Sequence, residues 1–261
     1  MLVATWNVNG IRARSQRLTE WLAERKPDVV CLQELKILED DFPHLEIRSL
    51  GYHAVLAGQQ SWNGVAVLAR EKPEVVTREL PGAAENGARF IVARACGIEF
   101  ASVYAPNGKS VAHPDFAMKL AWFDKLAVYA ETRAERDSPL VLGGDFNVAP
   151  TDMDSFGGVL SRGRSHHTDE ERKLVSRLRE AGMVDLFRAR YPEDPGYSWW
   201  DYRAGCFHKN QGMRIDLLFA TTAVAKRVTD VFVDREYRKK GKPSGSIPSD
   251  HAPLVAVLEN A

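Results

Sequence analysis

The sequence predicts an α/β fold in which two mixed β-sheets pack face to face and helices lie on the outside. The first observation is that short apolar runs alternate with a few longer amphipathic stretches. The second is that several runs are apolar at every position, as in 29–32, which indicates strands covered on both faces. The third is size, because 261 residues that are 44% hydrophobic can bury a sizeable core.

The expected strands are short, rich in β-branched residues and bounded by turn residues. The expected helices carry apolar residues at helical spacing, as Leu18, Trp21 and Leu22 do in the first of them. The predicted strands are 2–6, 28–33, 53–57, 64–69, 90–94, 99–104, 140–143, 214–219, 228–233 and 254–258, and the predicted helices are 15–25, 116–133 and 170–181.

The chain is expected to form a single domain over residues 1–261. A polar stretch at 130–138 is the best midpoint, and each half contains an apolar strand that ends in an acidic signature. No low-complexity linker or short-period repeat separates the halves. We therefore expect two pseudo-symmetric halves of one domain, with a boundary near 130–138.

Composition limits the compartment and the partners. Thirty-five basic and thirty-five acidic residues cancel, so no global field marks a polyanionic partner, although a local patch is compatible with this balance. Three cysteines, Cys31, Cys96 and Cys206, are an odd number at unrelated spacings, which argues against a disulfide framework and for a reducing compartment. No apolar leader or run of 18 apolar residues occurs. We expect a cytoplasmic protein without a membrane segment, and a monomer by default.

Carboxylates and amides follow or begin apolar runs in five separate segments. These segments are WNVNG at 6–10, LQE at 32–34, GDFN at 144–147, RID at 214–216 and SDHA at 249–252. Residues two apart on a strand point to the same side, so Asp145 and Asn147 project together while Phe146 faces the core. Asp, Glu and Asn oxygens with one His suit a hard divalent cation such as Mg²⁺ better than zinc. The pattern indicates a divalent-metal phosphoesterase site.

Each segment also has a purely structural interpretation. Asn7 and Asn9 are compatible with an Asx turn that ends a strand. Glu34 is as compatible with a solvent-facing strand end as with a metal ligand, and a lone His such as His251 is more often structural. Asp216 heads an apolar run, where an isolated carboxylate would be costly without a cation or donors. Five such endings in one chain favour the shared site.

The ordered motifs WNVNGIRAR, LQELK, WNGVAVLAR, VYAPN, GGDFNVAP, SWWDYRAG, GMRIDLLFA and SDHAP resemble the exonuclease III family of DNA-repair nucleases over nearly the whole chain. That family belongs to the endonuclease/exonuclease/phosphatase superfamily. The resemblance implies a four-layer α/β sandwich with the site between the sheets, and Mg²⁺- or Mn²⁺-dependent hydrolysis of DNA phosphodiesters.

The resemblance also implies a role for each site residue. Glu34 matches the principal metal carboxylate. The remaining metal ligands, or the residues that hydrogen-bond to the ligands, would be Asn7, Asp145, Asn147, Asp250 and His251. Asn9 would stand beside this set. Asp145 matches the residue that positions or deprotonates the attacking water, and Asn147 the amide that holds this water or the phosphate. His251, oriented by Asp216, would donate to a phosphate oxygen, and Tyr104 would contact the phosphate.

The expected partner is double-stranded DNA with base-free sites, nicks or 3′-blocked ends. Trp199, Met213 and Ile215 match residues that line a pocket for a base-free sugar. Trp62 fits either the rim of that pocket or the core. The residues expected to contact DNA elsewhere are Asn9, Arg12, Arg14, Arg17, Asn107, Lys109, Arg235, Arg238, Lys239, Lys240 and Lys242. For the five basic residues between 235 and 242, the alternative is an ordinary solvated loop that does not bind DNA.

One segment departs from the family pattern. His166 and His167 stand where family members often carry a small residue and an aromatic one. A bulky imidazole at His166 would narrow the damaged-sugar pocket. This narrowing should hinder an internal base-free nucleotide, which must be extruded from the duplex, more than a nucleotide at a frayed 3′ end. We therefore expect 3′→5′ exonuclease and 3′-end processing, with incision at base-free sites in question; the alternative is that His166 simply faces solvent.

Two other functions fit parts of the pattern. A sibling phosphoesterase acting on RNA, phospholipid or inositol phosphate would keep GDFN and SDH, but not SWWDYR. A catalytically silent nucleic-acid-binding module would be expected to lack at least one residue of the site, whereas all are present.

Overall fold

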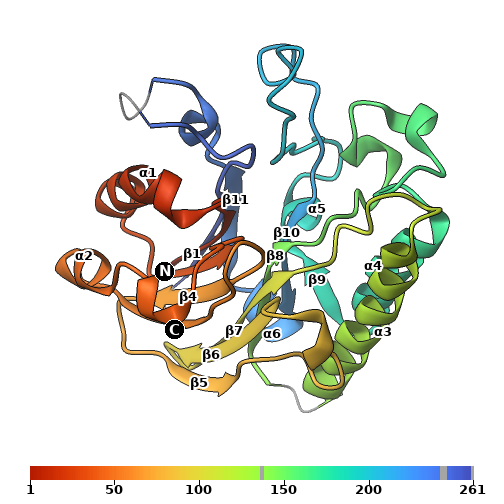
Figure 1. The fold of residues 1–261 in the computed structure, drawn as a ribbon. Helices are drawn as coiled ribbons and strands as arrows, with labels where there is room; N and C mark the ends of the chain where they lie inside the picture. The colour runs from red at the N-terminus through yellow and green to blue at the C-terminus, as the bar shows by residue number, and fades with distance from the viewer. Residues whose placement is uncertain (136–137, 242–245, 260–261) are drawn as a thin grey trace.

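The computed structural model describes residues 1–135, 138–241 and 246–259, which form two six-stranded mixed sheets (Figure 1). The first sheet has the order β11-β12-β1-β2-β4-β3, with β1 and β2 parallel and the other pairs antiparallel. Its strands are β1 (Leu2–Asn7), β2 (Val29–Gln33), β3 (His53–Ala57), β4 (Val65–Ala69), β11 (Val228–Val233) and β12 (Leu254–Leu258).

The second sheet has the order β5-β6-β7-β8-β10-β9, and only β7 and β8 run parallel in it. Its strands are β5 (Glu74–Thr77), β6 (Phe90–Ala95), β7 (Ile98–Tyr104), β8 (Leu140–Asp145), β9 (Met183–Asp185) and β10 (Asp216–Thr221). The edge strands β5 and β9 were missed from the sequence, because they are only three or four residues long.

Helices cover the outer face of each sheet, so the fold has four layers, as predicted. One apolar cluster lies between the sheets and includes Val29, Phe100 and Leu218. A second joins α3 and α4 to the second sheet, and a third joins α1 and α2 to the first. The helices are α1 (Ile11–Arg25), α2 (His44–Ser49), α3 (Pro114–Glu135), α4 (Asp169–Glu180), α5 (Leu186–Arg190) and α6 (Thr222–Ala225), with 3₁₀ turns η1 (Glu39–Asp41), η2 (Ala84–Asn86), η3 (Asp152–Asp154), η4 (Gly158–Ser161) and η5 (Arg235–Arg238).

The expected boundary near 130–138 falls at the end of α3, and residues 136 and 137 lie outside the described part of the chain. Each expected half contributes strands to both sheets, so neither sheet corresponds to one half.

In the described residues, no helix is long and apolar enough to span a membrane. Cys31 is buried, which raises the pKa of its thiol to about 12, and all three cysteines are free.

Candidate active site

The acidic and amide side chains meet because four strands end at the same place. β1 ends at Asn7 and β8 ends at Asp145, while Glu34 directly follows β2. Asp216, the first residue of β10, lies directly opposite Asp145 in the antiparallel ladder. Trp199 forms an isolated bridge with His251, which brings the SWWD and SDHA segments to the same edge. The five predicted segments therefore converge across the gap between the two sheets.

Asn7 links the two carboxylates that were predicted to bind metal. Its Nδ2 donates to Glu34 Oε1 at 2.8 Å and to Asp145 Oδ2 at 2.9 Å. Ligand atoms of Glu34, Asp145 and His251 all lie within 4.8 Å of one another. Burial raises the pKa of Asp145 to about 7, and the charges of Asp216 and Glu34 add to this effect. Glu34 differs, since Lys36 and Asn7 outweigh its burial and lower its pKa.

His251 is held by Asp216, as the resemblance implied. Its Nδ1 lies 2.8 Å from Asp216 Oδ2, and Ser198 Oγ donates to the same oxygen at 2.6 Å. Burial alone would lower the pKa of His251, but the charge and hydrogen bond of Asp216, with Asp145 and Asp250, raise it to about 10. His251 is therefore an imidazolium that directs Nε2 towards Asp145, at 3.8 Å from Oδ2. A doubly protonated ring donates a hydrogen bond, and it must lose its Nε2 proton before that nitrogen can bind a metal ion.

Asp250 sits beside this pair, with both oxygens engaged. Trp199 Nε1 donates to Oδ2 and Asn9 Nδ2 donates to Oδ1, each at 2.9 Å. These bonds and the charge of His251 outweigh burial and lower the pKa of Asp250. Lys36, to which the sequence analysis gave no role, donates to Asn9 Oδ1 at 2.6 Å and pairs with Glu34 Oε2 at 2.8 Å. Its place two residues after Glu34 was the available signal.

The donor set fits a hard divalent cation. Glu34, Asp145 and Asp250 supply carboxylate oxygens, which such ions prefer. Asn7 presents its amide nitrogen to Glu34 and Asp145, whereas its Oδ1 accepts from the backbone of Asn9 at 2.9 Å. An amide nitrogen cannot be a ligand, so Asn7 would bind a cation only after its amide group rotates. Asp250 is outside the 4.8 Å cluster of Glu34, Asp145 and His251.

A buried ion pair supports the turn that carries Asn147. Lys119 Nζ donates to the backbone oxygen of Asn147 at 2.7 Å and to that of Asn107 at 3.3 Å, and it pairs with Glu171. Asn107 Nδ2 also donates to Asn147 Oδ1 at 3.1 Å. Neither Lys119 nor Glu171 was anticipated from the sequence. A lone lysine on the apolar face of the 116–133 helix was the signal.

His166 also contacts this turn. Its ring Nδ1 lies 2.5 Å from the backbone oxygen of Asn147, and its backbone N–H donates to Glu171 Oε1 at 3.0 Å. Burial, with the nearby charge of Lys119, lowers the pKa of His166 to about 4. The alternative that this side chain simply faces solvent is therefore wrong. His167 is buried and engages Ser155 Oγ.

Several residues of the site have left-handed backbone conformations. The φ angle is 53° at Glu34, 51° at Asn147 and 72° at His166. Such conformations cost energy in non-glycine residues and concentrate at functional sites, where surrounding contacts hold them.

Tyr104, the last residue of β7, lies opposite Asp145 of β8, and the Arg89 guanidinium is 4.8 Å from the centre of its ring. Burial and the charges of Glu34 and Asp145 raise the pKa of Tyr104, so it is a neutral hydrogen-bond donor.

Comparison with known proteins assigns this arrangement to a family. The family model described as the endonuclease/exonuclease/phosphatase family matches residues 4–251. The chain belongs to the endonuclease/exonuclease/phosphatase family. Exodeoxyribonuclease III from Haemophilus influenzae is 34% identical to this member, over 98% of this chain and 99% of its own. The predicted resemblance is therefore confirmed.

Solved structures of other family members have the same fold. The 3′ phosphatase NExo from Neisseria, bound to a product DNA hairpin, matches with a TM-score of 0.94 and 35% identity, and 99% of each chain is covered. An AP endonuclease from Archaeoglobus fulgidus matches with a TM-score of 0.92 and 34% identity, also over 99% of each chain. The predicted four-layer sandwich is confirmed.

In this family member, the residues predicted to contact DNA differ in how exposed their side chains are. Arg12, Asn107, Lys109 and Lys239 are exposed, and three of them pair with acids: Arg12 with Asp41, Lys109 with Asp115 and Lys239 with Glu236. Asn9, Trp199 and Met213 are half-buried at the site edge. Arg235 and Lys240 are also exposed, Arg14 is half-buried, and Lys242 lies outside the described residues.

Three residues predicted to contact DNA have buried side chains. Ile215 is only 3% exposed. Arg17 donates to the backbone oxygens of Tyr237 and Ser246, and Arg238 donates to those of Asp250 and Trp200. These two guanidinium groups brace the loops around the site instead of offering charge to a phosphate. Trp62, in contrast, is 70% exposed, which excludes the core alternative.

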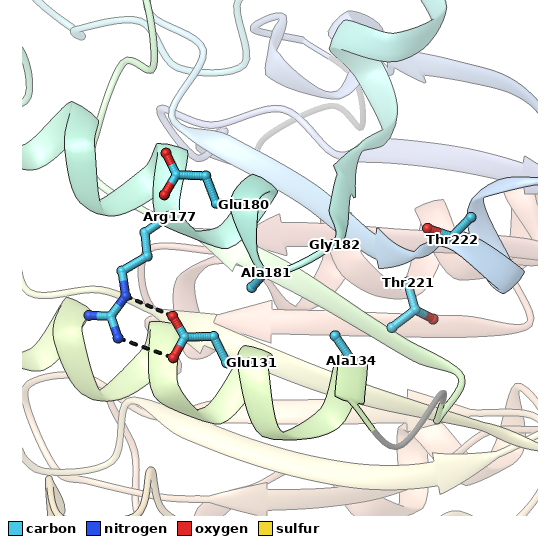
Figure 2. A pocket seen from close by; sticks show the side chains of 8 residues that line it. All are labelled: Glu131, Ala134, Arg177, Glu180, Ala181, Gly182, Thr221 and Thr222. Carbon is cyan, nitrogen blue, oxygen red and sulfur yellow. Dashed lines mark hydrogen bonds and ion pairs between the residues drawn. The ribbon is translucent and has the colours of Figure 1, made fainter.

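A separate pocket lies at the far end of β10, between the ends of α3 and α4 (Figure 2). Thr221, at the opposite end of β10 from Asp216, lines it together with the start of α6. Its one arginine, Arg177, is paired with Glu131 at 2.7 Å. None of the predicted site residues lines this pocket. The proposed chemistry therefore belongs to the opposite end of β10, where Asp216 lies beside Asp145.

Proposed function

We propose that this protein is a divalent-metal-dependent DNA-repair nuclease that removes nucleotides and blocking groups from 3′ ends. The observation that carries the proposal is the juxtaposition of Asp145, whose pKa is about 7, with the imidazolium of His251. Phosphodiester hydrolysis requires a base whose pKa is near neutrality to accept a proton from water, and a protonated donor to bind a phosphate oxygen. Relatives named as an exodeoxyribonuclease, a 3′-5′ exonuclease and an AP endonuclease match this chain over nearly its full length, which favours DNA over phospholipid or inositol phosphate.

In this proposal, Asp145 accepts a proton from, or orients, the attacking water, and Asn147 holds this water or the phosphate. His251 donates from Nε2 to a phosphate oxygen, while Asp216 fixes the ring through Nδ1. Tyr104 contributes a neutral hydroxyl donor. Mg²⁺ or Mn²⁺, held by Glu34 with Asn7 and Asp250, would polarise the phosphoryl oxygen and offset developing charge.

We further propose that incision at internal base-free sites is restricted by His166. The imidazole is fixed against the Asn147 turn by the contact with its backbone oxygen. A fixed ring obstructs an extruded sugar more than a mobile one would, whereas a frayed 3′ end needs little extrusion. Both activities occur among the similar structures, one a 3′ phosphatase and one an AP endonuclease.

The proposal extends to the setting of the enzyme. We take residues 1–261 as one domain and the protein as a cytoplasmic monomer. Its substrates would be duplex DNA with nicks, 3′-blocked ends or base-free sites. These assignments follow from composition and from the resemblance.

The test is a side-by-side assay on three DNA substrates: a recessed 3′ end, a 3′-phosphate at a nick and an internal base-free site. We expect cleavage of the first two, its loss with EDTA and its return with Mg²⁺ or Mn²⁺. Activity that survives chelation, or DNA binding without cleavage, would contradict the proposal. His166→Gly should raise incision of the base-free site relative to 3′ trimming; glycine suits the φ of 72° at this position.

A further inference from the structure

The segment 153–160, between β8 and α4, exposes a group of large apolar side chains. Leu160 is 86% exposed, Val159 62%, Phe156 57% and Met153 38%. Single apolar residues on a surface are ordinary, but several adjoining ones mark a contact surface. We call these four residues the apolar tip.

An ion pair and hydrogen bonds hold the backbone of the apolar tip in place. Thr151 and Asp154 form a capping box at η3, and Asp154 is fully buried in an ion pair with Arg214 at 2.6 Å. The backbone N–H of Phe156 donates to the oxygen of Gly212 at 2.9 Å. Because the backbone is already fixed, a partner that binds here pays little entropy for ordering the segment.

The segment 153–160 and the turn that follows it are connected to residues of the proposed active site. On one side, backbone bridges run from Ser155 to Met213, from Met213 to Trp199 and from Trp199 to His251. On the other side, His166 contacts the backbone oxygen of Asn147. A duplex whose phosphate lies at Asp145 and His251 would therefore extend past backbone that these contacts connect to the apolar tip.

Charge favours DNA as the occupant. Arg164 is exposed four residues after Leu160 along the chain, and its guanidinium makes no ion pair with the described residues. A free cation beside apolar side chains matches a DNA strand, which presents phosphates next to sugars and base edges.

We propose that the apolar tip packs against the sugars and base edges of duplex DNA next to the phosphate being cleaved, with Arg164 on a neighbouring phosphate. This inference rests on the proposed function. It assigns duplex recognition to residues outside the catalytic set.

The test compares wild type with Val159→Ser/Leu160→Ser on two substrates, a duplex with a recessed 3′ end and a 3′-phosphorylated dinucleotide too short to reach the tip. We expect KM for the duplex to rise about tenfold with kcat nearly unchanged, and hydrolysis of the dinucleotide to be unaltered. The matched control is Leu45→Ser, since Leu45 is 81% exposed on α2 and should have no effect. Arg164→Gln should reduce the salt dependence of duplex binding by about one phosphate contact.

Three results would overturn the inference: an unchanged KM for the duplex, an equal loss on both substrates, or a wild-type protein that self-associates without DNA while the double variant does not. The last would identify the tip as a contact between copies of the chain, which sedimentation detects. Failure of the proposed function is distinct, because wild type would then cleave neither substrate.

Discussion

Lys119 and Glu171 form an ion pair in which neither side chain is exposed to solvent. The ammonium group also donates to the backbone oxygens of Asn147 and Asn107, while Glu171 accepts from the backbone of His166 and caps α4 through Thr168. One buried pair thus fixes both the turn after Asp145 and the turn that carries His166. Loss of a single partner leaves the other charge buried and uncompensated.

Lys119→Met should lower the free energy of unfolding by about 3–5 kcal/mol, because Glu171 then keeps its buried charge without a cation. Urea denaturation measures this value. Lys125→Met is the matched control on the same helix, since Lys125 pairs with Glu85 at the surface and should cost less than about 1 kcal/mol. Equal losses in the two variants would show that burial of the Lys119 pair is not the cause.

Asp145→Asn should abolish proton acceptance at the site while preserving its shape. We expect kcat for 3′-end cleavage to fall by about 10²–10⁴ or more, with the Kd for DNA within a few-fold of wild type. Fluorescence anisotropy and single-turnover cleavage give the two quantities. Asp40→Asn, an exposed position, should alter neither. A variant at Asp145 that cleaves normally would show that another group handles the water.

The sequence predicted the central strands well because their patterns are local. Runs such as 29–33 and 254–258 are short, rich in Val and apolar at almost every position, which is typical of a strand covered on both faces. The helix at 11–25 was expected to start at Ser15, and no side-chain cap before Ile11 marks its true start. β5 and β9 could not be predicted, because short edge strands acquire their conformation from neighbours rather than from composition.

For the candidate site, the sequence identified residues that end strands but not those that support them. Asp145 and Asp216 belong to recognisable motifs, and their pairing follows once β8 and β10 are adjacent. Lys119 lies 26 residues before Asp145 along the chain, so only the packing of α3 against the second sheet reveals its contact with Asn147. The burial of Arg17, in α1, and of Arg238, in η5, was missed for the same reason, since the local sequence carries no sign of what covers a basic side chain.

Asp216→Asn should move the alkaline limb of the pH–rate profile to lower pH by about 1–3 units. The charge and hydrogen bond of Asp216 are the main causes that hold the pKa of His251 at about 10, against its burial. Without them, His251 loses its proton at lower pH and can no longer donate from Nε2. The profile of kcat between pH 6 and 10 measures the shift, with Asp124→Asn at an exposed ion pair as the control. An unshifted limb would mean that His251 is not the titrating donor.

His166 should make the metal-free protein less stable in mild acid. Burial and the charge of Lys119 lower the pKa of His166 to about 4, from an ordinary value of 6.5. The unfolded chain therefore binds a proton that the folded one refuses, so this contribution to stability is present above pH 6.5 and is lost as pH falls towards 4. Between pH 7.5 and 5, the loss should be about 2 kcal/mol. His166→Gly should remove this part of the pH dependence in urea denaturation, whereas the same slope in both proteins would show that His166 is protonated in the folded state.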